Sequence, residues 1–277
     1  MPSAIPRRTS PLPGLGLSLG ITIFWLSLIV LVPLSAVFLR SVSGGWGNFW
    51  AAAASPRALA AYRLSFGAAA LAAGINCVFG LLVAWVLVRY RFAGRRLLSA
   101  LIDLPFALPT AVAGIALTAL YADTGPIGRI IEPLGLPIAY RPAGVVLALV
   151  FIGLPFVVRT VEPVLAAASR EIEEAALTLG ATRLQTFFRV ILPTLAPALG
   201  TGFALAFARG AGEYGSVIFI AGNMPFKSEI APLLIVTQLE EYNYAGAAAI
   251  ACVMLLISFA ALLALNLLQN WQQRRMA

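Results

Sequence analysis

Residues 15–39 read LGLSLGITIFWLSLIVLVPLSAVFL and contain no charged side chain. A helix needs about 20 apolar residues to cross the hydrocarbon core of a bilayer, and this run exceeds that length. A cleaved signal peptide is the alternative, because Arg7 and Arg8 precede the run. The apolar part is longer than the roughly 7–15 residues usual in signal peptides. The stretch therefore predicts a first transmembrane helix that is retained.

Five further apolar runs follow, and charged residues mark their ends. We predict six spans, over residues 15–39, 62–88, 101–121, 142–160, 195–221 and 245–268. The whole chain, 1–277, is then one all-α integral membrane domain with short connections. The composition agrees with this, because 61% of the residues are hydrophobic and only 11% are charged. Soluble domains carry about 25% charged residues.

Arginine supplies nearly all of the formal net charge of +8, since Lys227 is the only lysine. Nucleic-acid binding is excluded as the explanation, because the arginines lie between apolar runs and form no basic stripe on a soluble face. Arginines beside spans are typical of contact with anionic lipid. With the N-terminus inside, the inner segments hold about twice as many arginines and lysines as the outer ones. This bias predicts that both termini are cytoplasmic.

Several kinds of catalytic site are excluded by the residues that the chain lacks. It has no histidine, which removes histidine–metal sites and histidine-dependent triads. Cys77 and Cys252 both lie in apolar runs, which favours buried thiols over a disulfide. Neither a Gly-x-Ser-x-Gly elbow nor a Walker A loop is present. We therefore predict no metal site and no catalytic site, which argues against a membrane enzyme.

Prolines stand near the start of two predicted spans. Pro105 and Pro109 lie near the start of the third span, and Pro193 and Pro197 lie near the start of the fifth. Proline is tolerated in a first helical turn, where its missing N–H would be unpaired in any case. These prolines therefore indicate either ordinary helix starts or deliberate bends beside a pathway.

The connection 162–193 is the longest predicted cytoplasmic segment, and it has a helical pattern of its own. Ser169 is placed to cap a helix, and Gly180 is placed to end it. Thr182 and Gln185 have the spacing of a capping box for a second helix. The first helix combines acidic residues with an apolar face that is spaced as i, i+3, i+4 and i+7. That face consists of Ile172, Ala175, Ala176 and Leu179. The connection is either an ordinary surface hairpin or a docking site for a soluble protein.

Two charged side chains fall inside the predicted fifth span, near its middle. Arg209 and Glu213 are spaced as i and i+4, so that they can face each other. Charges in a span are costly and mark either a packing pair or a pathway. Asp103 lies near the cytoplasmic mouth of the third span. It either has a functional role in the pathway, or it caps a helix or extends its carboxylate to the membrane surface. We assign a translocation path or gate to Arg209, Gly212, Glu213, Asp103 and Thr110.

Three stretches of the sequence resemble known membrane proteins. Glu174-Ala175-Ala176, Gly180 and residues 190–193 (VILP) resemble the EAA motif of ABC-importer permeases, with Val190 where that pattern has isoleucine. Residues 103–114 (DLPFALPTAVAG) are similar to the third span of sulfate/thiosulfate permeases of the CysT type. Residues 209–216 (RGAGEYGS) and 220–223 (IAGN) are similar to a stretch shared by sulfate and molybdate permeases. The resemblance covers nearly the whole chain.

The resemblance implies a type I ABC-importer permease (MetI-like) fold in the bacterial inner membrane, and import of sulfate or thiosulfate. It implies that the EAA helix contacts an ATPase subunit through Glu171, Glu174, Ala175, Ala176 and Gly180. The partners it implies are a second, CysW-like permease, two CysA-like ATP-binding subunits and a periplasmic sulfate-binding protein. ATP and magnesium would then bind to the ATPase subunits, and this chain would hold no cofactor and would not be an enzyme. The alternatives are a permease for molybdate or another oxyanion, and a secondary transporter, which needs no EAA helix.

Overall fold

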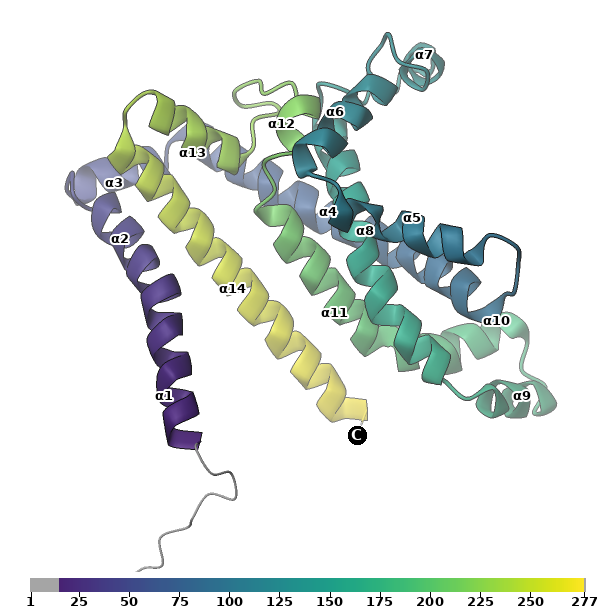
Figure 1. The fold of residues 1–277 in the computed structure, drawn as a ribbon. Helices are drawn as coiled ribbons and strands as arrows, with labels where there is room; N and C mark the ends of the chain where they lie inside the picture. The colour runs from purple at the N-terminus through teal and green to yellow at the C-terminus, as the bar shows by residue number, and fades with distance from the viewer. Residues whose placement is uncertain (1–14, 277) are drawn as a thin grey trace, which may run out of the picture.

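The computed structural model describes residues 15–276, and every regular element in this range is a helix (Figure 1). The α-helices and the shorter π- and 3₁₀-helices follow one another in this order: α1 Leu15–Leu26, η1 Ser27–Leu31, α2 Val32–Ser41, α3 Trp46–Ala53, α4 Pro56–Arg89, α5 Arg95–Ala107, α6 Thr110–Tyr121, α7 Gly128–Ile131, η2 Glu132–Leu134, α8 Pro142–Ala167, α9 Arg170–Thr178, α10 Arg183–Thr186, η3 Phe187–Ile191, α11 Leu192–Ala211, α12 Val217–Ile220, α13 Ala231–Glu240 and α14 Tyr244–Met276. The predicted all-α fold is confirmed.

Five helical segments are long and apolar enough to cross a membrane. They are Leu15–Ser41, Pro56–Arg89, Pro142–Ala167, Arg183–Ala211 and Tyr244–Gln269. The pair α5 and α6 makes a sixth if the two are counted as one span. Most of these segments extend beyond the predicted spans, because the helices continue into the connections. Where the membrane surfaces cross them stays a prediction.

The third predicted span, 101–121, is wrong as a single helix. It is divided between α5 and α6, which meet at an angle of 114°. Leu108 is extended (φ −82°, ψ 136°), as expected of a residue that precedes proline, and Pro109 takes the N-cap position of α6. Pro109 thus stands at a helix start and at a bend, and the two alternatives for this proline are both realised.

The helix that contains most of the fifth predicted span, 195–221, has other bounds than the span. The helical segment begins at Arg183 in the connection, and it ends at Ala211. Gly212 follows as the C-cap, and the chain then turns back against α6. At Gly215 a Cβ would lie 2.2 Å from the Thr110 Oγ1, so only glycine allows this approach. The Arg209 side chain therefore lies in the last turn of the helix and not near its middle.

Two π-helical turns stand directly before prolines. η1 leads into α2, which has Pro33 in its first turn, and η3 leads into α11, which has Pro193 there. A proline ring clashes with the carbonyl of the fourth residue before it and offers no N–H. The wider π turn relieves that clash and lets the long helices continue.

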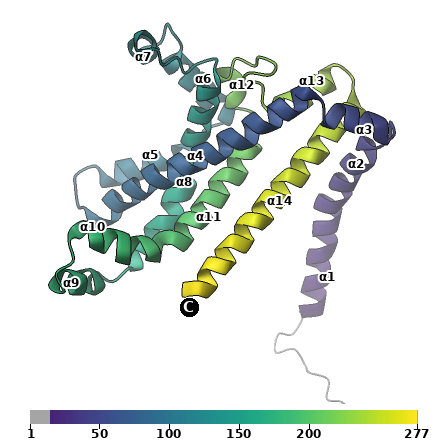
Figure 2. The ribbon, with the colours of Figure 1, turned by 180° about the vertical axis from the view of Figure 1, so that it is seen from behind.

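The centre of the molecule is formed by α4, α8 and α11, which pack along one another (Figure 2). Small residues allow their backbones to approach closely, as in other membrane helix bundles. A Cβ at Gly80 of α4 would lie 2.9 Å from Val157 of α8, and one at Gly202 of α11 would lie 2.9 Å from the Val157 Cα. In α4, Ala68, Ala69, Ala72 and Ala73 are buried in the same core.

The two ends of the molecule carry different elements. Short helices α3, α7, α12 and α13 lie at one end, and α9 lies at the other, together with the start of α1 and the end of α14 (Figure 1). The first helical segment stands apart from the central helices, and α1 has no buried residue. The fold thus places the connection 162–193 at the end of the molecule where the described chain begins and finishes.

Candidate functional site

The helix α9 begins and ends at the residues that the pattern predicts. The Ser169 side chain accepts a hydrogen bond from the Glu171 backbone N–H at 3.1 Å, and so caps the N-terminus. Glu171 and Glu173 lie in the first turn, where the helix dipole favours negative charge. Gly180 follows the helix with φ +85°, a conformation that residues with a Cβ rarely adopt. The chain direction therefore changes sharply after α9.

The second helix of the connection is fixed by the predicted capping box. The Gln185 N–H donates to the Thr182 hydroxyl oxygen at 3.3 Å, and the Thr182 N–H donates to the Gln185 side-chain oxygen at 2.8 Å. From there α10, η3 and α11 run on as one segment. A displacement of this connection would consequently be carried directly into a core helix.

The surface of α9 is open, and much of it is apolar. No residue of α9 is buried; Ile172 is 59% exposed and Leu179, just after it, is 89% exposed. Glu171, Glu174 and Ala175 are also exposed. A groove of about 350 Å³ separates α9 from α10 and η3; its lining includes Ala176, Leu179, Gly180, Gln185 and Arg189. An apolar, grooved surface outside the predicted spans is typical of a protein docking site.

One ion pair joins α9 to the central helices, and sequence reasoning missed it. Glu173 of α9 accepts a hydrogen bond from Arg89, the last residue of α4. The Arg89 guanidinium also lies over the Trp85 ring at 5.5 Å, and Trp85 packs edge-on against Phe187 of η3 at 5.7 Å. These contacts hold both helices of the connection against the end of α4. The two charges are 84 positions apart in the sequence, so no local pattern signals the pair.

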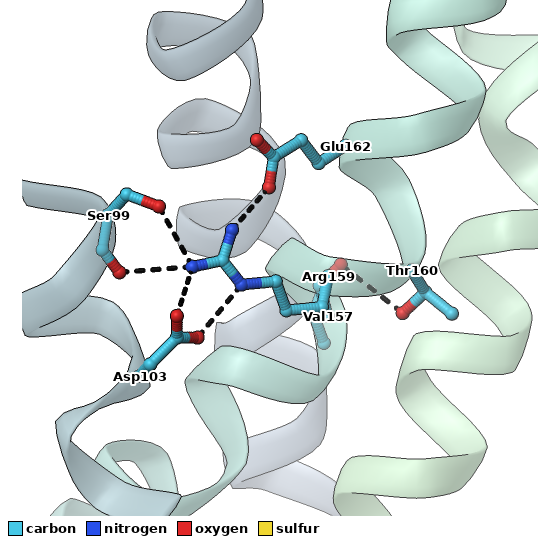
Figure 3. Close-up of polar contacts among 6 residues, drawn as sticks. All are labelled: Ser99, Asp103, Val157, Arg159, Thr160 and Glu162. Carbon is cyan, nitrogen blue, oxygen red and sulfur yellow. Dashed lines mark hydrogen bonds and ion pairs between the residues drawn. The ribbon is translucent and has the colours of Figure 1, made fainter. Parts of the chain in front are cut away.

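Asp103 is not a capping or snorkelling residue, because it pairs with Arg159 of α8. The Arg159 Nε donates to one carboxylate oxygen at 2.8 Å, and Nη2 donates to the other at 2.5 Å (Figure 3). Nη1 reaches Glu162 at 2.6 Å, and Nη2 also donates to the Ser99 hydroxyl at 2.9 Å. The predicted fourth span, 142–160, ends directly after Arg159, whereas α8 continues to Ala167. Its arginine therefore lies within the helix and ties α5 to α8.

The predicted pair of Arg209 and Glu213 is confirmed as an ion pair, at 2.5 Å. Glu213 lies beyond the helix, and its side chain is only 3% exposed. Its second oxygen accepts hydrogen bonds from the Ser216 N–H and hydroxyl, at 2.9 and 3.0 Å. Thr110 reaches the same turn through its contact with Gly215. The predicted pathway residues thus form two groups, one around Glu213 with Gly212 and Thr110, and one at Asp103.

A further pair, which the sequence does not signal, lies at the opposite end of the molecule from α9. Arg57, near the start of α4, makes a two-pronged contact with Glu229, at 2.8 and 2.6 Å. The Glu229 side chain is 3% exposed, and it belongs to the connection between α12 and α13. This contact fixes the connection against α4.

A family of known proteins matches most of this chain. Residues 76–277 match the family described as binding-protein-dependent transport system inner membrane component. The sulfate transport system permease protein CysT of Synechococcus elongatus is 51% identical over 250 residues, which are 90% of each chain. The protein of the same name from Escherichia coli strain K12 is 48% identical over 264 residues, which are 95% of each chain.

Solved structures share the fold at low sequence identity. A chain of a bacterial ABC transporter that imports the acidic polysaccharide alginate superimposes with a TM-score of 0.76 at 15% identity, covering 92% of this chain and 94% of that one. A chain of the inward-facing methionine transporter MetNI superimposes with a TM-score of 0.59 at 18% identity, covering 76% of this chain and 94% of that one. The fold is the type I, MetI-like fold of ABC-importer permeases.

These similarities span nearly the full length of the chain and agree with its helical architecture. The family consists of membrane transport components, so the chain is not itself an enzyme. The chain belongs to the binding-protein-dependent transport system inner membrane components, as a multi-pass ABC-importer permease subunit of the CysT type.

Proposed function

We propose that this chain is a permease subunit for the import of sulfate or thiosulfate, driven by ATP hydrolysis on another subunit. Its relatives at about half identity over nearly the full length are described as sulfate transport permeases. The chain supplies helices for the translocation path, and it binds neither ATP nor magnesium. Arg209, Gly212, Glu213, Asp103 and Thr110 belong to the path or its gate.

The observation that carries this proposal is the open apolar surface of α9. Leu179 and Ile172 are exposed beside acidic residues, on a helix that lies outside the spans. A soluble ATPase subunit that covers this surface would bury the apolar side chains and could pair its arginines with Glu171 and Glu174. Ala175, Ala176 and Gly180 are small enough to let that partner approach closely. Movement of the ATPase would then reach α11 through η3, and α4 through Arg89.

The chain works with several partners in this proposal. They are a second, CysW-like permease, two CysA-like ATP-binding subunits and a periplasmic sulfate-binding protein. The first helical segment, Leu15–Ser41, supports a second permease or lipid beside it, because no residue of its most apolar stretch is buried within this chain. We place both termini in the cytoplasm, as the arginine bias predicts. Because the start of α1 lies at the same end of the molecule as α9, α9 would then be cytoplasmic, and the short helices α3, α7 and α13 at the other end would face the periplasm (Figure 1).

The substrate is tested by uptake of radiolabelled sulfate into cells that lack their own sulfate permeases. Cells that receive this chain with its neighbouring transporter subunits should take up sulfate, and excess unlabelled thiosulfate should compete. The absence of uptake, or competition by molybdate stronger than that by unlabelled sulfate, would contradict the proposed substrate. A chain with Gly180 replaced by valine serves as the uncoupled control in the same cells.

A further inference from the structure

A cavity of about 280 Å³ lies beside the Arg159 contacts, at the start of α5. Its walls are formed by Leu87, Arg95, Arg96, Ser99 and Glu162. Three separate helices, α4, α5 and α8, contribute these residues. The cavity is distinct from the exposed surface of α9 and from the group around Glu213, and it adjoins the Asp103 group through Ser99 and Glu162, which Arg159 contacts.

The charges around this cavity do not balance. Asp103 and Glu162 are both engaged by Arg159 (Figure 3). The side chains of Arg95 and Arg96 have no hydrogen-bond or ion-pair partner among the described residues. Three arginines therefore face two carboxylates, and one positive charge is left over. Arg95 and Arg96 are both exposed, so an anion can reach them from solution, where their two neighbouring positive charges attract it.

The donors that line the cavity suit a tetrahedral oxyanion. Guanidinium groups match the spacing of two oxygens on a sulfate or phosphate group and bind them in pairs. The Ser99 hydroxyl oxygen already accepts a hydrogen bond from Arg159, so its own proton is available to donate. Arg95, Arg96 and Ser99 lie within five positions of one another on α5, so they can act on one ligand.

We propose that this cavity is an oxyanion-binding site at the start of α5. The ligand is a tetrahedral oxyanion, either a free sulfate-class dianion or the phosphate of an anionic phospholipid in the adjacent leaflet. Its placement at the end of the transport path, on the cytoplasmic side, rests on the proposed function. The binding of an oxyanion by Arg95 and Arg96 does not, because it follows from the cavity and its charges.

The test uses the complete purified transporter, without its binding protein. Equilibrium dialysis against radiolabelled sulfate in lipid-free detergent measures the free oxyanion. Native mass spectrometry of transporter taken from mixed phosphatidylglycerol and phosphatidylcholine measures the retained lipid. The test variant carries Arg95→Ala with Arg96→Ala. Arg91→Ala is the control, since Arg91 lies just before α5, is exposed like Arg95 and Arg96, and does not line the cavity.

Loss of two charge-assisted donors should weaken binding at least about tenfold in the test variant and leave the control unchanged. If sulfate binding falls, the ligand is the free oxyanion; if retention of phosphatidylglycerol falls, the ligand is the lipid phosphate. Equal sulfate binding and equal lipid retention in wild type and test variant would overturn the site. If the alanine variant does not fold, Arg95→Lys with Arg96→Lys preserves the charge, and its weaker pairing of oxygens gives the same comparison.

The failure of this site differs from the failure of the proposed function. Wild-type cells that take up no sulfate would contradict the function while leaving the cavity's oxyanion binding measurable in the purified protein. Normal sulfate uptake together with no oxyanion bound at Arg95 and Arg96 would contradict only the site.

Discussion

At the scale of single residues, two of the ion pairs combine a buried carboxylate with a partly exposed arginine. Glu213 and Glu229 are each 3% exposed, whereas their partners Arg209 and Arg57 are 37% and 32% exposed. A carboxylate that is shielded from water depends on its partner, but the arginine can regain water if the pair is broken. The free-energy cost of breaking each pair therefore comes mainly from the buried carboxylate that is left without its arginine.

Removal of Arg209 alone should harm the protein more than removal of the whole pair. Arg209→Ala leaves the buried Glu213 with only its Ser216 contacts, at a cost of about 1–3 kcal/mol, reduced because the Arg209 side chain is partly exposed. Arg209→Ala with Glu213→Ala removes both charges. The thermal midpoint of the purified transporter and its sulfate uptake measure the difference. A double variant that is worse than the single one would contradict a paired-charge role.

The pairing partners show what a sequence can reveal at this scale. The pairing of Arg209 with Glu213 was predictable from their i, i+4 spacing, and the pair forms even though Glu213 lies just beyond the end of α11. Asp103 was singled out, but its partner Arg159 was not, because their contact depends on how α5 folds back onto α8. The Arg89–Glu173 and Arg57–Glu229 contacts also join distant segments. Such pairs follow from tertiary packing, which no local pattern encodes.

At the scale of elements, prolines and glycines determine where helices bend, widen and end. The sequence placed the caps of the connection 162–193 correctly, because capping depends on residues within one turn. It could not decide between a helix start and a bend at Pro109, because the 114° angle depends on what α5 packs against. It also let the fifth span continue past Gly212, since the turn there depends on contact with Thr110 of α6.

Gly180 is expected to matter for coupling and not only for stability. Its φ of +85° disfavours any residue with a Cβ, so Gly180→Ala should cost roughly 1–2 kcal/mol of local strain. Gly45→Ala is a matched control, because Gly45 has φ +88° and open space around it, at the other end of the molecule. Copurification of the ATPase subunit should fall for Gly180→Ala only. An equal fall for both variants would indicate a general loss of stability.

The Arg89 contact should transmit force from α9 to α4. Arg89→Ala removes the ion pair with Glu173 and the contact with Trp85, a loss of about 1.5–3 kcal/mol for a charged hydrogen bond. ATP hydrolysis should then continue with less sulfate imported per ATP. Arg91→Ala, two positions further on, should leave this ratio at the wild-type value. Unchanged coupling in Arg89→Ala would assign the pair to packing alone.

At the scale of the whole molecule, the chain exposes surfaces that require partners. The segment Leu15–Ser41 is long and apolar, but no residue of its most apolar stretch is buried. On the opposite side of the bundle, α9 exposes leucine and isoleucine side chains. A single permease chain therefore accounts for its core but leaves these two surfaces uncovered. Lipid or a second permease suits the first surface, and a soluble ATPase suits the second.

Contact between α9 and an ATP-hydrolysing subunit in the cytosol can be measured by photo-cross-linking. The photoreactive residue is placed at Leu179, which is 89% exposed, or at Leu134, which is 69% exposed. Leu134 belongs to η2, which directly follows α7 at the other end of the molecule. In intact cells that contain the complete transporter, we expect an adduct with the ATPase subunit from position 179 and none from position 134. An adduct only from 134, or none from 179 while the transporter still imports its substrate, would mean that the ATPase subunit does not hold α9.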